Sequence, residues 1–112
     1  MDAEAVVARR LMEATGVRAY PEVPSDKPGE FITVEQTGSS EGNVSRVSLA
    51  VQAWAQTRKR AREIAEAAKA AVCDLDEVDN IFNPEAESVY RYPDPDSRMA
   101  RYQLGAVIRI CE

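Results

Sequence analysis

The stretch Val47–Val72, VSLAVQAWAQTRKRAREIAEAAKAAV, changes its hydrophobic period half-way along. Up to Trp54, apolar and polar residues alternate, as in a β-strand that is covered on one face only. From Thr57, which has the chemistry of an N-cap, apolar residues recur at helical spacing, and most are alanines that allow close approach to a sheet. The apolar positions of the strand are Val47, Leu49, Val51 and Ala53, and those of the helix are Ala61, Ile64, Ala65, Ala68, Ala71, Val72 and Leu75. The stretch therefore predicts a strand that runs directly into a helix.

Upstream, the sequence predicts one more helix and two strands. Asp2 can cap a first helix, and Gly16 stands where a C-terminal glycine belongs. Three prolines and the absence of any periodicity predict a loop after Tyr20. The predicted elements are a helix over Ala3–Thr15, a short strand over Val17–Tyr20, a loop over 21–30, a strand from Phe31 and a turn over Thr37–Asn43.

Downstream, the sequence predicts an acidic connector and two more strands. The connector is Asp74–Pro84, the next strand is Glu87–Tyr92, which ends at Pro93, and the last strand is Arg101–Cys111. Hairpins combined with helices favour an α+β fold. We expect a single domain over residues 1–112, in which an antiparallel sheet of four to five strands carries two helices on one face as a two-layer sandwich.

Composition bears on the class of protein. The chain has 112 residues, with 14 Lys and Arg against 19 Asp and Glu, and its net charge of −5 disfavours direct sequence-specific binding of nucleic acid. The absence of histidine removes the commonest general base and most zinc sites, so we expect no enzyme and no cofactor. No segment resembles a signal peptide or a membrane span, which predicts a soluble, cytosolic protein.

Two features of the sequence could indicate a metal site or a disulfide. Read as a calcium loop from Asp74, the connector has Val78 where a ligand oxygen belongs and Asp79 where the turn needs glycine, so no metal is expected. Cys73 and Cys111 are expected to be two buried thiols, with a disulfide between them as the alternative.

The stretch Ser88–Gln103, SVYRYPDPDSRMARYQ, concentrates polar and aromatic chemistry. Asp94 and Asp96 could form an acid–base pair, and tyrosines interleaved with arginines could stack on bases. The flanking prolines favour a third interpretation, an exposed turn in which Asp94 and Asp96 pair with Arg98 and Arg101, either within the turn or across a subunit boundary.

The second predicted helix carries charges that oppose its macrodipole at both ends. Basic residues crowd its start, and acidic residues crowd its end, with Lys59–Glu63 and Arg62–Glu66 as compensating pairs along the helix. One interpretation is a solvated surface. The other is that the basic and acidic ends of neighbouring copies mate head-to-tail. The basic residues are Arg58, Lys59, Arg60 and Arg62, and the acidic residues are Asp74, Asp76 and Glu77.

Three stretches in order resemble the tail terminator (tail completion) proteins of long-tailed bacteriophages. They are PGEFITVEQTG from Pro28, the strand–helix stretch Val47–Val72 with its Gln-x-Trp-Ala ending at Gln52–Ala55, and YRYPDPDSRMARYQLGAVIRI from Tyr90. The segment before Pro28 has little counterpart in the family, and Ser39-Ser40 stands where a second glycine is common.

The resemblance implies a structural virion protein that forms a ring, usually of six subunits. The ring caps the tail tube, ends its polymerisation and joins the tail to the head connector, so the implied partners are further copies, the tail tube protein and the connector. Trp54 and Tyr102 are then structural, and the turn after Thr37 and the loop after Pro93 are candidate contacts. The alternatives are another head–tail connector or neck protein, and a small non-catalytic protein-binding adaptor.

Overall fold

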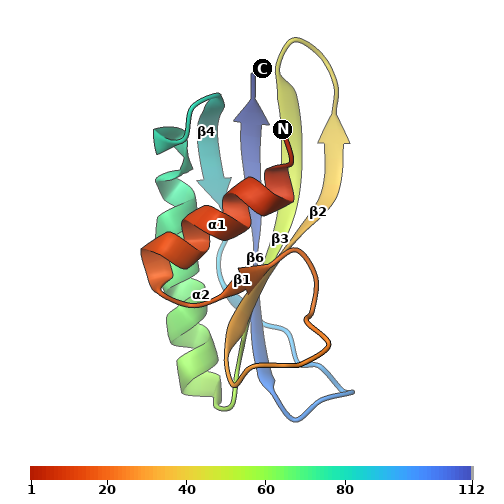
Figure 1. The fold of residues 1–112 in the computed structure, drawn as a ribbon, viewed down its shortest axis with the longest axis vertical. Helices are drawn as coiled ribbons and strands as arrows, with labels where there is room; N and C mark the ends of the chain where they lie inside the picture. Colours follow the sequence, from red (N-terminus) through yellow and green to blue (C-terminus); the bar gives the residue numbers. More distant parts are fainter. Residues whose placement is uncertain (112) are drawn as a thin grey trace.

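The computed structural model describes residues 1–111 as two helices packed on one face of a six-stranded sheet (Figure 1). In chain order the elements are α1 (Ala3–Thr15), β1 (Ala19–Tyr20), β2 (Phe31–Ser40), β3 (Ser45–Ala55), α2 (Arg58–Cys73), the 3-10 turn η1 (Leu75–Glu77), β4 (Ile81–Ala86), β5 (Tyr90–Arg91) and β6 (Ala100–Ile110). The α+β class and the position of both helices are confirmed.

The sheet is mixed and has six strands, so the prediction of an antiparallel sheet of four to five strands is wrong in both details. Its order is β1-β2-β3-β6-β4, with β5 pairing β6 beyond the end of β4. The two-residue β1 pairs with β2 in parallel, because the loop over residues 21–30 carries the chain back to the start of the sheet, so that β2 runs in the same direction as β1. The other pairings are antiparallel, and β3 and β6 match over eleven residues, from Ser45 opposite Ile110 to Ala55 opposite Ala100.

The fourth strand was also misplaced. The predicted connector Asp74–Pro84 contains the start of β4, and the predicted strand Glu87–Tyr92 shortens to the two residues of β5. Two asparagines with positive φ, Asn80 at 72° and Asn83 at 47°, turn the chain into and along β4. Pro84 is tolerated in this strand because β4 lies at the edge of the sheet and carries a shift of register between Phe82 and Glu85.

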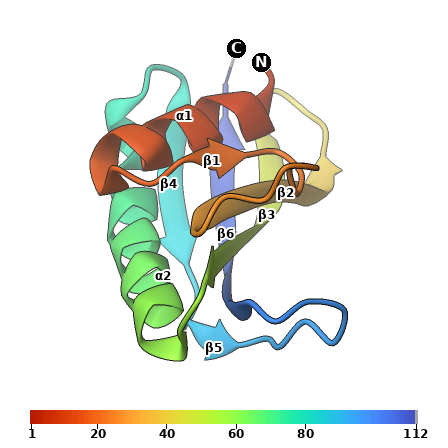
Figure 2. The same ribbon diagram turned by 60° about the horizontal axis from the view of Figure 1, so that its bottom comes forward.

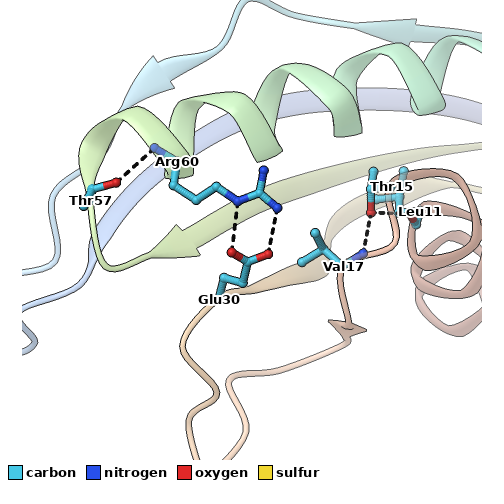
Figure 3. Close-up of polar contacts among 6 residues, drawn as sticks. All are labelled: Leu11, Thr15, Val17, Glu30, Thr57 and Arg60. Carbon is cyan, nitrogen blue, oxygen red and sulfur yellow. Dashed lines mark hydrogen bonds and ion pairs between the residues drawn. The ribbon is translucent and has the colours of Figure 1, made fainter.

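The predicted helix caps are confirmed. Asp2 accepts a hydrogen bond from the N–H of Ala5 at 3.2 Å, and Thr57 accepts one from the N–H of Arg60 at 3.2 Å (Figure 3). Gly16 ends α1 at φ 73°, and its N–H donates to the carbonyl of Met12. The hydroxyl of Thr15 then accepts from the N–H of Val17, which directs the chain towards β1.

The core lies between the helices and the sheet. The alternating residues of β3 and β6 meet the apolar stripes of both helices there, and one contiguous buried cluster joins all four elements. In α2 the residues nearest the sheet are mostly alanine, and Ala61 and Ala68 are fully buried. Their small side chains let α2 lie close to β3 and β6, as the sequence predicts.

Both edges of the sheet carry features that obstruct pairing with another strand. At the β2 edge, the Glu4 carboxylate of α1 accepts the N–H of Gln36 at 2.7 Å, just beyond the part of β2 that pairs with β1. At the opposite edge, β4 is bent by Asn83 and lacks a donor at Pro84. The fold therefore supplies its own edge protection over these parts of the sheet.

Candidate assembly surface

On the face of the sheet away from the helices, aromatic rings and one arginine stack in a row at the end where β3 meets α2. Phe31 and Trp54, neighbours on β2 and β3, stack with ring centroids 5.3 Å apart and an interplanar angle of 14°. The guanidinium of Arg101 lies 4.8 Å from the Trp54 ring and 4.3 Å from the Tyr92 ring. Trp54 is thereby only 3% exposed, although no helix covers this face. Its predicted structural role is consistent with this burial.

A row of polar side chains crosses the same face next to the rings. The indole N–H of Trp54 donates to the hydroxyl of Thr33, which donates to Gln52, each at 3.3 Å. Gln52 donates in turn to Gln103 at 2.7 Å, and Gln103 contacts the hydroxyl of Tyr90. The row joins β2, β3, β6 and β5. Sequence reasoning placed Gln52 on this face but missed the row, because the row depends on the register between strands far apart in the chain.

Arg101 holds the loop between β5 and β6 through main-chain atoms. Its guanidinium donates to the carbonyl of Tyr92 at 2.7 Å and to that of Pro93 at 3.2 Å. The side-chain hydrogen bonds described for Arg101 thus go to carbonyls, and not to the carboxylates of the ion pairs expected from the sequence. Tyr102 points the other way and packs half-buried against the core under the helices, consistent with a structural residue.

Asp94 and Asp96 form a tight turn. The backbone N–H of Asp96 donates to the Asp94 carboxylate at 3.1 Å, and this bond holds the pKa of Asp94 below its ordinary value, with smaller contributions from Ser97, Arg101 and Lys27. The Asp94 carboxylate is therefore kept ionised, in the state that accepts hydrogen bonds. This contact fixes the shape of the loop.

The basic end of α2 is only partly neutralised within the chain. Arg60 makes a bidentate ion pair with Glu30, at 2.9 and 2.8 Å, which lowers the pKa of Glu30 and raises that of Arg60 (Figure 3). Arg58, Lys59 and Arg62 make no side-chain hydrogen bond or ion pair with the residues described. The expected pairs Lys59–Glu63 and Arg62–Glu66 are accordingly not formed there.

These three cations line a groove of about 590 Å³ between the first turns of α2 and β6. Its other lining residues are Glu63, Glu66 and Tyr102. A second hollow of about 430 Å³ adjoins it, because Arg58 lines both. This hollow is also lined by Arg91 of β5 and by Arg98 of the loop between β5 and β6. Figure 2 shows β5 beside the first turn of α2 at this end of the molecule.

The acidic end of α2 lies at the opposite end of the helix. With 16 residues at about 1.5 Å each, α2 separates the two ends by roughly 24 Å. Two of the nearby acids are paired within the chain, Glu77 with Arg10 at 2.9 Å and Glu85 with Arg109 at 3.0 Å. Asp74, Asp76 and Asp79 are exposed and, among residues 1–111, make no side-chain hydrogen bond or ion pair.

Among residues 1–111, no group of three or more Cys, Asp or Glu residues is arranged to hold a metal ion. Cys73 and Cys111 are free thiols, as expected. Cys73, in the last turn of α2, is exposed and Cys111 is half-buried, so the expectation that both are buried is wrong. None of the described helices has the length and apolar character to cross a membrane.

Comparison with known proteins finds a likeness of fold. A chain in a solved structure described as "Virion of native gene transfer agent (GTA) particle" superposes with a TM-score of 0.58, covering 98% of this chain and 98% of that chain at 12% sequence identity. The two chains share one fold. No protein-family model matches the sequence, and no curated protein matches it.

Proposed function

We propose that this chain is a structural protein of a phage-like virion. The observation that carries the proposal is the end-to-end likeness of fold to a chain of the gene transfer agent particle, at 98% coverage of both chains. A match over nearly all of both compared chains is more informative than a match to a part, because it includes every helix and strand described above. Since a fold alone does not define a function, the residues must supply the rest of the argument.

Within the virion, we assign the chain the role of a tail terminator. It forms a ring, of six copies by analogy with the resembled family, on the end of the tail tube, stops the tube from growing and joins it to the head connector. The chain acts without catalysis or cofactor, and it assembles in the host cytoplasm before residing in the neck of the particle. The charge polarity along α2 supports a head-to-tail ring, in which each copy offers one end to each neighbour.

A tube-capping experiment tests this role. The purified chain is added to polymerising tail tube protein from the same genome, and tube length and tube ends are examined by electron microscopy. A terminator shortens the tubes as its concentration rises and appears as a ring at one end. Tubes of unchanged length with bare ends would show that the chain is not a terminator.

The same likeness of fold is equally compatible with a second role in the neck, that of a head–tail connector. The matched structure is that of a whole particle, and its description does not assign the chain to one position in it. A head–tail connector would bind purified connector rings and leave growing tubes unaffected, so the same preparations distinguish the two roles. A chain that binds neither and captures some other small protein would be an adaptor.

A further inference from the structure

The groove beside the first turns of α2 has unbalanced charge. Arg58, Lys59 and Arg62 line it without a partner among the described residues, whereas Arg60 beside them is paired with Glu30. Each of these cations also lies near the positive end of the helix macrodipole, which disfavours it. The Tyr102 ring lies in the same lining. The groove thus offers three unpaired cations next to an aromatic surface.

The groove is not basic throughout. Glu63 and Glu66 line it further along α2, so its charge changes sign along the helix. A uniform polyanion such as the phosphate backbone of a nucleic acid would meet these carboxylates as well as the cations, and the net charge of −5 would oppose its approach. The pattern suits a folded partner that carries acids and bases in a fixed arrangement, because alternating charges determine register.

The far end of the same molecule carries such an arrangement. Asp74, Asp76 and Asp79 are three unpaired carboxylates in the segment that follows α2, and Asp74 lies at the negative end of the macrodipole, which disfavours it. A cationic side chain also lies close by, because Arg10 forms an ion pair with Glu77. Three free cations at one end are therefore matched by three free carboxylates at the other.

We infer that the acidic end of one copy, formed by Asp74, Asp76 and Asp79, docks into the groove lined by Arg58, Lys59 and Arg62 of a second copy. This inference rests on the proposed ring, for which it names the contact between neighbours. The two surfaces differ, so the contact is heterologous and each copy remains able to bind one more on either side. The obstructed strand edges leave side chains as the groups available for this recognition.

Two charge-reversal variants test the contact. The basic-end variant is Arg58→Glu/Lys59→Glu/Arg62→Glu, and the acidic-end variant is Asp74→Lys/Asp76→Lys/Asp79→Lys. Arg58→Glu, Lys59→Glu and Asp74→Lys favour the macrodipole, and this offsets the repulsion that Lys59→Glu and Arg62→Glu introduce toward Glu63 and Glu66. Both variants are therefore expected to fold, and thermal unfolding followed by circular dichroism compares each with the unchanged chain. A loss of association in these variants is then a loss of contact, not of structure.

Association is measured by sedimentation velocity up to millimolar concentration in about 0.05 M salt, where exposed charges are least screened. We expect the unchanged chain to associate, and we expect the dissociation constant of each variant alone to be at least about tenfold larger. A tenfold change in the dissociation constant needs only a modest change in the free energy of association. An equimolar mixture of the two variants should associate again, because each variant supplies the charge that the other has lost. Raising the salt to about 0.5 M should dissociate all of these assemblies.

A matched control reverses the same number of charges elsewhere. Arg18→Glu/Lys27→Glu/Arg46→Glu alters three exposed cations outside the groove and should associate like the unchanged chain. A chain that stays monomeric throughout, variants that associate normally, or a mixture that fails to recover would each overturn the inference. If the mixture recovers but neither it nor the unchanged chain caps tail tubes, then the contact stands and the terminator role falls.

Discussion

Replacing Arg101 by alanine should destabilise the fold itself, through the rings and carbonyls that the guanidinium contacts. Two of these contacts are hydrogen bonds to the carbonyls of Tyr92 and Pro93, at 2.7 and 3.2 Å. The other two are stacking contacts with the Trp54 and Tyr92 rings. Without them, the loop after β5 loses its attachment to the sheet, and the outer face of Trp54 is uncovered.

The four contacts set the size of the effect. A hydrogen bond of this kind contributes about 0.5–1.5 kcal/mol, and a cation–π contact at a partly exposed site about 0.5–1 kcal/mol. Because contacts of one side chain are not additive, we expect Arg101→Ala to lower the free energy of unfolding by about 2–3 kcal/mol. For a chain of this size that corresponds to a fall in Tm of roughly 10 °C. Arg101→Lys should lose about half as much, since it keeps the charge and loses the planar stack.

Urea unfolding followed by tryptophan fluorescence measures this directly, because Trp54 is the single tryptophan of the chain. Arg101→Ala should also shift the emission of the folded state to longer wavelength, as water reaches the ring. Arg98→Ala is the matched control, an exposed arginine of the same loop for which a change within about 0.5 kcal/mol is expected. If Arg101→Ala unfolds at the same urea concentration as Arg98→Ala, then the stack does not hold the loop as argued.

Three further substitutions test other parts of the fold. Gly16→Ala forces a side chain into a left-handed conformation at φ 73° and should cost about 1 kcal/mol in thermal unfolding. Thr33→Val removes the acceptor of the Trp54 indole N–H and should cost about 1–3 kcal/mol; an unchanged urea midpoint would mean that water replaces the hydroxyl. Glu30→Gln weakens the pair with Arg60. The pKa of Glu30 is lowered from its ordinary value of 4.5, so the ion pair stabilises the fold above that pH and is lost as the pH falls below it. The Glu30→Gln variant and the unchanged chain should therefore converge in stability in acid, which circular dichroism measures.

The elements that local patterns determine could be predicted from the sequence. The alternation from Val47, the N-caps Asp2 and Thr57 and the terminal Gly16 each depend on neighbours a few residues away, and the structure confirms each of them. The alternation also places Trp54 on the face opposite Val51 and Ala53, and the structure confirms this, although the burial of Trp54 under Arg101 did not follow from it.

The features that were missed depend on pairing between distant segments. The parallel course of β1 beside β2 is decided by how the loop over 21–30 returns, and a two-residue strand has no periodicity of its own. The strand β4 was hidden by Asn83 and Pro84, residues typical of turns that an edge strand tolerates. The pairing of Arg60 with Glu30, 30 residues apart, likewise needs the folded chain, and it reduces the set of basic residues available to a partner.

The contact between Glu4 and the N–H of Gln36 has a consequence for fidelity. Backbone hydrogen bonds are the same for every sequence, so a bare strand edge accepts any extended segment that approaches it, whether or not it belongs to the same assembly. Where a side chain already accepts from that N–H, a binding partner must be recognised by groups that differ between proteins, namely charges and aromatic rings. In the proposed ring, such groups would let the chain select further copies of itself even among unrelated sheet proteins at high concentration.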